Sequence, residues 1–130
     1  MYSYDRRIIA GRVTFGRFGR LDADGGDPAD ILLDGVRVGE IARQVDSRMV
    51  GVTQRLFNVT AYVASIQGPL AGLHGAEALD DKPFESLPEL KRALTVLLSK
   101  VPDGVSEAYR LYWDRKITSE EWRNRVEALL

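Results

Sequence analysis

The dipeptide Asp34-Gly35 stands between two β-forming runs, residues 31–33 (Ile-Leu-Leu) and 36–38 (Val-Arg-Val). A two-residue type I′ turn needs positive φ at both central positions, and Asp and Gly tolerate that conformation. The dipeptide therefore predicts a tight hairpin, and this hairpin commits the flanking chain to an antiparallel sheet. We expect the second strand to carry a bulge at Gly39. Val36 and Val38 are at even positions whereas Ile41 is at an odd one, so in a regular strand they would lie on opposite faces. One extra residue between them would place all three on the same face of the sheet.

A third strand is indicated between residues 56 and 66, where apolar and polar residues alternate with a period of two. The expected inward positions are Phe57, Val59, Ala61 and Val63. The segment 6–18 is interpreted as a further strand, with Ile9, Val13 and Phe15 on one side. A short helix from about Tyr4 is the alternative, which Gly11, Gly16 and Gly19 disfavour.

The strongest helix signal begins at Ser86, which forms a capping box with Glu89. The helix is expected to cover the sheet and to end before Pro102-Asp103-Gly104. Its apolar stripe consists of Leu87, Leu90, Leu94, Leu97, Leu98 and Val101.

A second helix is predicted at about 105–115 and a third after Thr118, which forms another capping box with Glu121. Together these two helices predict a C-terminal helical hairpin. Its aromatic residues, Tyr109, Tyr112, Trp113 and Trp122, are either internal packing or interface anchors.

Residues 67–85 have no convincing period, although a helical turn near Ala76 to Leu79 fits the sequence. Loops of this length are usually functional or mobile. The loop is also acidic, which makes it a candidate interface. The overall expectation is one α+β domain over residues 1–130. It comprises an antiparallel sheet of three or four strands at about 6–66, the loop at 67–85, and the helical region at 86–130.

Composition excludes several classes of protein. The chain of 130 residues is 45% hydrophobic and 28% charged, which is typical of a globular protein. It contains no cysteine, which excludes disulfides and thiolate metal sites and fits a cytoplasmic protein. No apolar run is long enough to span a membrane, and the N-terminus does not have the features of a signal peptide. We therefore expect a cytoplasmic protein with no membrane association.

The sequence predicts no catalytic, cofactor or metal site. The single histidine, His74, is interpreted as a solvated loop residue, and Ser65 and Ser99 have no visible triad partner. The acidic run 22–30 superficially resembles a calcium loop, but Asp27 replaces the required glycine and Leu33 the bidentate glutamate. No glycine-rich phosphate-binding motif occurs. The protein is therefore expected not to be an enzyme.

The expected function is that of a non-enzymatic binding protein, an adaptor or an inhibitor, that occupies a surface of a protein or a protein–nucleic-acid complex. Small inhibitors from mobile elements, including anti-CRISPR proteins, often have this profile, although no motif here identifies one. The candidate interface residues are Glu77, Asp80, Asp81, Trp113 and Trp122.

Two alternatives remain open. Direct nucleic-acid binding is suggested by arginines interleaved with phenylalanines in the N-terminal segment, together with arginines on the sheet face. The net charge of −1 tempers this alternative. The other alternative is a structural subunit of a homo-oligomer. The candidate nucleic-acid or partner contacts are Arg6, Arg7, Arg12, Arg17, Arg20, Arg37 and Arg43.

Overall fold

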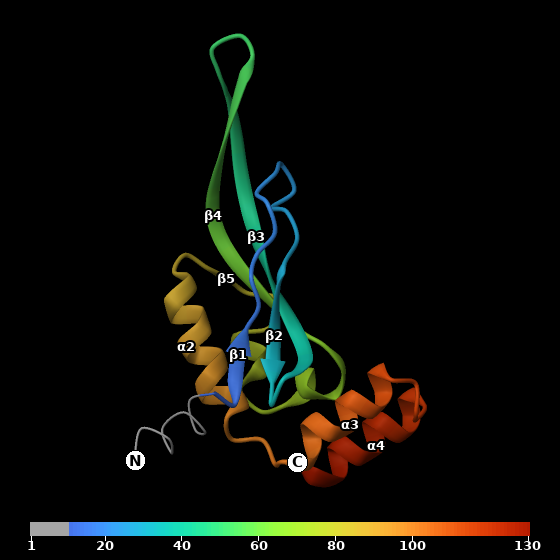
Figure 1. The fold of residues 1–130 in the computed structure, drawn as a ribbon. Helices are drawn as coiled ribbons and strands as arrows, with labels where there is room; N and C mark the ends of the chain where they lie inside the picture. Colours follow the sequence, from blue (N-terminus) through green and yellow to red (C-terminus); the bar gives the residue numbers. More distant parts are fainter. Residues whose placement is uncertain (1–10) are drawn as a thin grey trace, which may run out of the picture.

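The fold is α+β, as predicted, and is built on one antiparallel sheet in which consecutive strands are neighbours (Figure 1). The computed structural model describes residues 11–130. Over these residues the sheet has five strands rather than the three or four expected, because a short strand inside the predicted loop adds to its edge. The strands are β1 (Val13–Phe15), β2 (Ala29–Leu33), β3 (Val36–Val50), β4 (Gln54–Ile66) and β5 (Pro83–Phe84).

The predicted hairpin is confirmed, and a bulge lies at Val38, one residue before the predicted position at Gly39. Asp34 and Gly35 have φ angles of 52° and 82°, as the two central positions of the turn require. Further along, Ile31 pairs with Gly39 and Leu32 with Arg37, so the residue between them on β3 has no partner. This extra residue restores the apolar side chains of β3 to the buried face of the sheet.

A second bulge lies in β4 and was not predicted. Gln44 pairs with Ala61 and Val45 with Val59, which leaves Thr60 unpaired. The bulge changes the parity of the strand, so the fully enclosed positions beyond it include Ala64. The expected inward set Phe57, Val59, Ala61 and Val63 is therefore wrong as a single buried face. Ala61 is buried, whereas the other three are only half-buried.

The N-terminal segment forms a strand where it is described. Val13 and Phe15 of β1 pair with Leu33 and Ile31 of β2. The strand interpretation is thus confirmed for 13–15. The remainder of the segment, including Ile9 and the helix start considered at Tyr4, lies outside the described residues.

Within residues 11–130, the sheet is joined by three helices: α2 (Leu87–Leu98), α3 (Gly104–Trp113) and α4 (Ser119–Leu129). α2 packs on the sheet, and α3 and α4 lie side by side as a helical hairpin (Figure 1). In both predicted capping boxes, the hydrogen bond to the hydroxyl of the N-cap residue is confirmed. Ser86 Oγ accepts a hydrogen bond from the Glu89 N–H at 3.3 Å, and Thr118 Oγ1 accepts one from the Glu121 N–H at 3.1 Å.

The segment between β4 and α2 is part of the core. It contains two short 3-10 turns, η1 (Gly68–Gly72) and η2 (Ala76–Ala78). Leu70 in η1 is fully buried, and so is Ala76 in η2. Apolar residues in this segment follow neither a helical nor a strand period because the segment consists of short turns that each bury one or two residues.

Tyr109 of α3 fastens η1 to the helical hairpin. Its hydroxyl accepts a hydrogen bond from the Leu70 N–H at 3.0 Å and donates one to the Gln67 carbonyl oxygen. Burial raises the pKa of this hydroxyl well above its usual range. The phenol therefore stays protonated and keeps its donor.

Replacing Tyr109 with phenylalanine is expected to lower the free energy of unfolding by about 2 kcal/mol. The change leaves the N–H of Leu70 and the carbonyl of Gln67 without their buried partner. Urea denaturation followed by circular dichroism measures the loss. Tyr112→Phe is the matched control, because the Tyr112 hydroxyl makes no hydrogen bond to residues 11–130. Equal losses in the two variants would contradict the role given to the Tyr109 hydroxyl.

Candidate protein-binding arm

The paired strands β3 and β4 run far beyond the body of the protein as a two-stranded ribbon (Figure 1). The pairing of β2 with β3 ends at Ile41, and β5 pairs only with Tyr62 and Val63 of β4. We call residues 44–60, beyond these neighbours, the arm. The chain reverses at the arm's tip through residues 51–53, where Gly51 has a φ of 74°.

The base of the arm is held by Arg43. Its guanidinium donates to the carbonyl oxygens of Gly25 at 2.8 Å and Gly19 at 2.6 Å, and lies 4.6 Å from the ring centroid of Phe18. The loop between β1 and β2 is thereby fastened against β3. Within that loop, the Asp22 carboxylate accepts two backbone N–H groups at 2.8 Å, so the acidic run forms a hydrogen-bonded turn.

Cross-strand register sorts the arm into two faces, because directly paired residues share a face. The pairs Val45–Val59, Ser47–Phe57 and Met49–Arg55 make one face, which is apolar along most of its length. The opposite face carries the pairs Asp46–Asn58, Arg48–Leu56 and Val50–Gln54.

The tip of the arm exposes apolar side chains. The exposed fraction is 94% for Val52, 52% for Met49, 45% for Leu56 and 40% for Val50. These are four of the eight large apolar residues that are exposed within the described part of the chain. Apolar side chains gathered on a projecting element are typical of a surface that another molecule covers.

Charges on the arm are few and of both signs. Arg55 donates to the Ser47 hydroxyl at 3.4 Å across the two strands. Asp46 and Arg48 form no ion pair with any residue from 11 to 130. The arm therefore has no concentrated charge of either sign.

Arg12, a predicted contact residue, lies in a partly exposed polar network on the body of the protein. Its guanidinium contacts the Asp34 carboxylate at 3.1 Å and donates to the Ser99 carbonyl at 3.0 Å. Ser106 donates to the same carboxylate at 2.8 Å. The network joins β1, the β2–β3 turn, the end of α2 and the start of α3.

Arg37 is likewise engaged within the protein. It pairs with Asp30 at 3.1 Å and Glu40 at 3.0 Å, and donates to the side chain of Gln67 at 3.0 Å. Its carbonyl accepts a hydrogen bond from Trp113 Nε1 at 2.7 Å. These contacts connect the sheet to the helical hairpin.

The other predicted arginines are not brought together into one basic surface with these. Arg17 and Arg20 are exposed, whereas Arg12, Arg37 and Arg43 each donate hydrogen bonds to other residues of the protein. Arg6 and Arg7 lie outside the described residues.

The predicted acidic interface residues play separate roles. Asp80 accepts the Ile66 N–H at 2.8 Å and so fastens the end of β4. Glu77 is exposed and accepts the Gly75 N–H at 3.0 Å, and hydrogen bonds from the backbone hold the pKa of its carboxyl below the usual value. Asp81 is exposed at a turn with a φ of 62°.

The aromatic residues of the C-terminal hairpin pack mainly on one another. The Trp122 ring is buried, stacks on Tyr112 with centroids 3.9 Å apart, and meets Tyr109 edge-on at 4.9 Å. Trp113 remains 38% exposed beside Arg37. Of the two tryptophans, only Trp113 presents surface to a partner.

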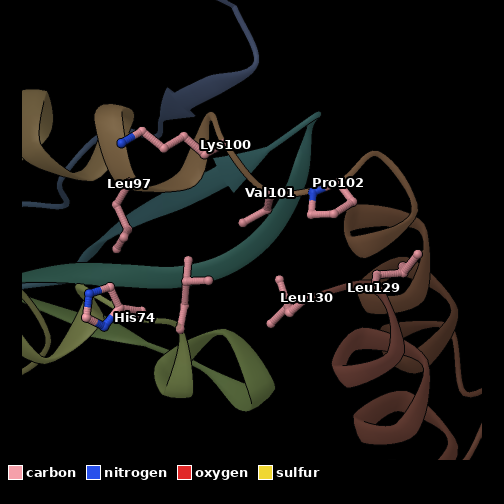
Figure 2. A pocket seen from close by; sticks show the side chains of 8 residues that line it. His74, Leu97, Lys100, Val101, Pro102, Leu129 and Leu130 are labelled. Atoms are coloured by element: carbon pink, nitrogen blue, oxygen red, sulfur yellow. The ribbon is translucent and has the colours of Figure 1, made fainter.

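An open apolar hollow of about 440 Å³ lies between the end of α2 and the end of α4 (Figure 2). His74 lines it beside leucines. Within residues 11–130, no cluster of histidine and carboxylate side chains has the arrangement to hold a metal ion. The residues around the hollow are Leu73, His74, Leu97, Lys100, Val101, Pro102, Leu129 and Leu130.

The sequence did not predict that the arm projects from the sheet, although it predicted parts of both strands. Whether a strand outruns its neighbours depends on the lengths of other strands, and no local pattern reports that. Gly51 between two long β-forming stretches was the one available signal for the tip.

Comparison with known protein families, with curated proteins and with solved structures finds no match to this chain. Among residues 11–130, no helix combines the length and the apolar character needed to cross a membrane.

Proposed function

We propose that the protein is a non-enzymatic binding protein, an adaptor or an inhibitor, that docks its arm onto another protein in the cytoplasm. The observation that carries the proposal is the projecting ribbon with exposed apolar side chains at its tip, Val52 foremost. Apolar anchors that become buried at the centre of an interface supply most of its binding free energy.

The charge distribution supports a protein partner over a nucleic acid. Phosphate binding requires arginines or lysines that are free to reach the backbone of the nucleic acid. Arg12, Arg37 and Arg43 are instead held by carboxylates and carbonyl oxygens of the protein itself. The arm carries only Arg48 and Arg55 against Asp46.

The test is affinity capture from the native host lysate, with and without nuclease, using the wild-type protein and a V52S/L56S variant. The expected result is a stoichiometric protein partner that survives nuclease and binds the variant at least about tenfold more weakly, since two apolar anchors are lost. V96S is the control, because Val96 is 55% exposed on α2, away from the arm. Equal binding by all three proteins, or a partner released by nuclease, would overturn the proposal.

A further inference from the structure

The outer edge of β3 is uncovered along the arm. β2 covers this edge as far as Ile41, and Gly25 of the β1–β2 loop packs against the Arg43 carbonyl. From Gln44 to Val50, the backbone of β3 makes no hydrogen bond to any described residue outside β4. A strand edge of this kind is a template for pairing with another strand.

The outer edge of β4 in the arm is a poorer template. Thr60 bulges out of the ladder, and a bulge bends and twists the strand that carries it. β3 has no bulge from Val45 to Val50. The edge of β4 is regular only from Gln54 to Val59, whereas the free edge of β3 is regular from Gln44 to Val50, so β3 offers the longer regular edge.

The free edge of β3 is complementary to itself. When two copies of residues 44–50 are laid antiparallel at full overlap, Ser47 lies on the two-fold axis. Asp46 of each copy then faces Arg48 of the other, and Val45 faces Met49. Opposite charges directly across a strand pair stabilise it, and Asp46 and Arg48 have no ionic partner among residues 11–130.

We propose that the protein forms a dimer in which the β3 edges of two arms pair antiparallel about Ser47. The two ribbons then make one continuous sheet in the order β4–β3–β3–β4. A sheet of this width with an apolar face is more stable than an isolated two-stranded ribbon. The apolar face of the arm, which includes Val45, Met49 and Phe57, becomes continuous across the dimer.

Other registers of the two β3 edges bring like charges face to face or mismatch the two faces of the arms. A shift of two residues in one direction places Asp46 against Asp46 of the second copy, and a shift in the other direction places Arg48 against Arg48. Like charges directly opposite destabilise a strand pair. A shift of one residue sets the apolar face of one arm beside the polar face of the other. The sequence thus favours the register centred on Ser47.

This pairing goes beyond the proposed docking function, because it uses the backbone edge of β3 whereas docking uses the side chains at the tip. The V52S/L56S variant is therefore expected to remain dimeric while it loses its protein partner. A failure of one proposal leaves the other standing, and the two measurements separate them.

Charge exchange tests the register. D46R and R48D each place two like-charged pairs across the dimer and are expected to weaken dimerisation about tenfold or more in sedimentation measurements. An equimolar mixture of the two variants is expected to recover the dimer, because every pair across that interface has opposite charges. The D46R/R48D double variant is expected to recover it as well. A monomeric wild type, or single variants that dimerise as well as the wild type, would overturn the proposal.

A cysteine at the two-fold axis gives a second test. The chain has no cysteine, and directly opposite Cα atoms lie about 4.5–5.5 Å apart, within the range that a disulfide spans. S47C is therefore expected to form a covalent dimer under mild oxidation. N58C, on β4 beside Phe57, the residue that pairs with Ser47, is the control and is expected to stay largely monomeric on a denaturing gel. Equal cross-linking of the two variants would contradict the β3 pairing.

Discussion

Substitution of Gly68 by alanine is expected to destabilise the protein by about 3 kcal/mol or more. Gly68 has a φ of 70°, a conformation that costs an L-residue roughly 1–2 kcal/mol. A methyl group there would also lie 2.2 Å from the Trp122 ring. That ring cannot swing away, because it is stacked on Tyr112 and buried beside Tyr109, so overpacking adds about 1–3 kcal/mol.

Chemical denaturation followed by tryptophan fluorescence measures the effect, since both tryptophans lie in or beside the affected cluster. Gly72→Ala is the control within the same 3-10 turn, because no atom lies within 4 Å of the position that its methyl group would take. The control is expected to change the free energy of unfolding by less than about 1 kcal/mol. Comparable losses at the two positions would show that Trp122 does not confine Gly68.

Leu94→Ala is expected to lower the free energy of unfolding by about 3 kcal/mol. Leu94 is fully buried in the stripe of α2 that packs against the sheet, and its truncation leaves a cavity lined by the remaining core. The loss has two parts, the transfer free energy of the removed carbon atoms and the cost of the cavity that they leave. It therefore exceeds the transfer free energy alone.

Val96→Ala, two residues along on the exposed side of α2, is the matched control and is expected to change stability by less than about 0.5 kcal/mol. Urea denaturation of the two variants gives the comparison. If the two substitutions had equal effects, α2 would not present its Leu94 face to the sheet.

The parts of the fold that were predictable depend on residues close together in the sequence. Asp34-Gly35 specifies its turn through two adjacent φ angles, and Ser86 and Thr118 mark helix starts through a backbone N–H three residues on. These signals need no knowledge of the rest of the molecule. The bulge near Gly39 was also predictable, because it left a change of parity in the apolar pattern.

The features that escaped prediction depend on distant partners. Pro83 and Phe84 become a strand only because β4 offers an edge there, and Thr60 bulges where the pairing with β3 shifts. The arginines show the same limit. Arg12 resembled a surface contact residue, but the carbonyl that it binds lies 87 residues further along the chain. Charge counts alone do not distinguish a free guanidinium from an engaged one.

The order of the strands also sets the order in which the protein can assemble during synthesis. Every strand after β1 pairs with the one made just before it, so the sheet can grow as the chain emerges. The β2–β3 and β3–β4 connections are tight turns, whereas the β1–β2 and β4–β5 connections (residues 16–28 and 67–82) are longer. The polar network around Arg12 behaves differently, because the carbonyl of Ser99 and the hydroxyl of Ser106 arrive only after α2 has been made. The contacts that join Arg12 and Asp34 to Ser99 and Ser106 can therefore form only after α2 has been synthesised, although the strands that they hold are made first.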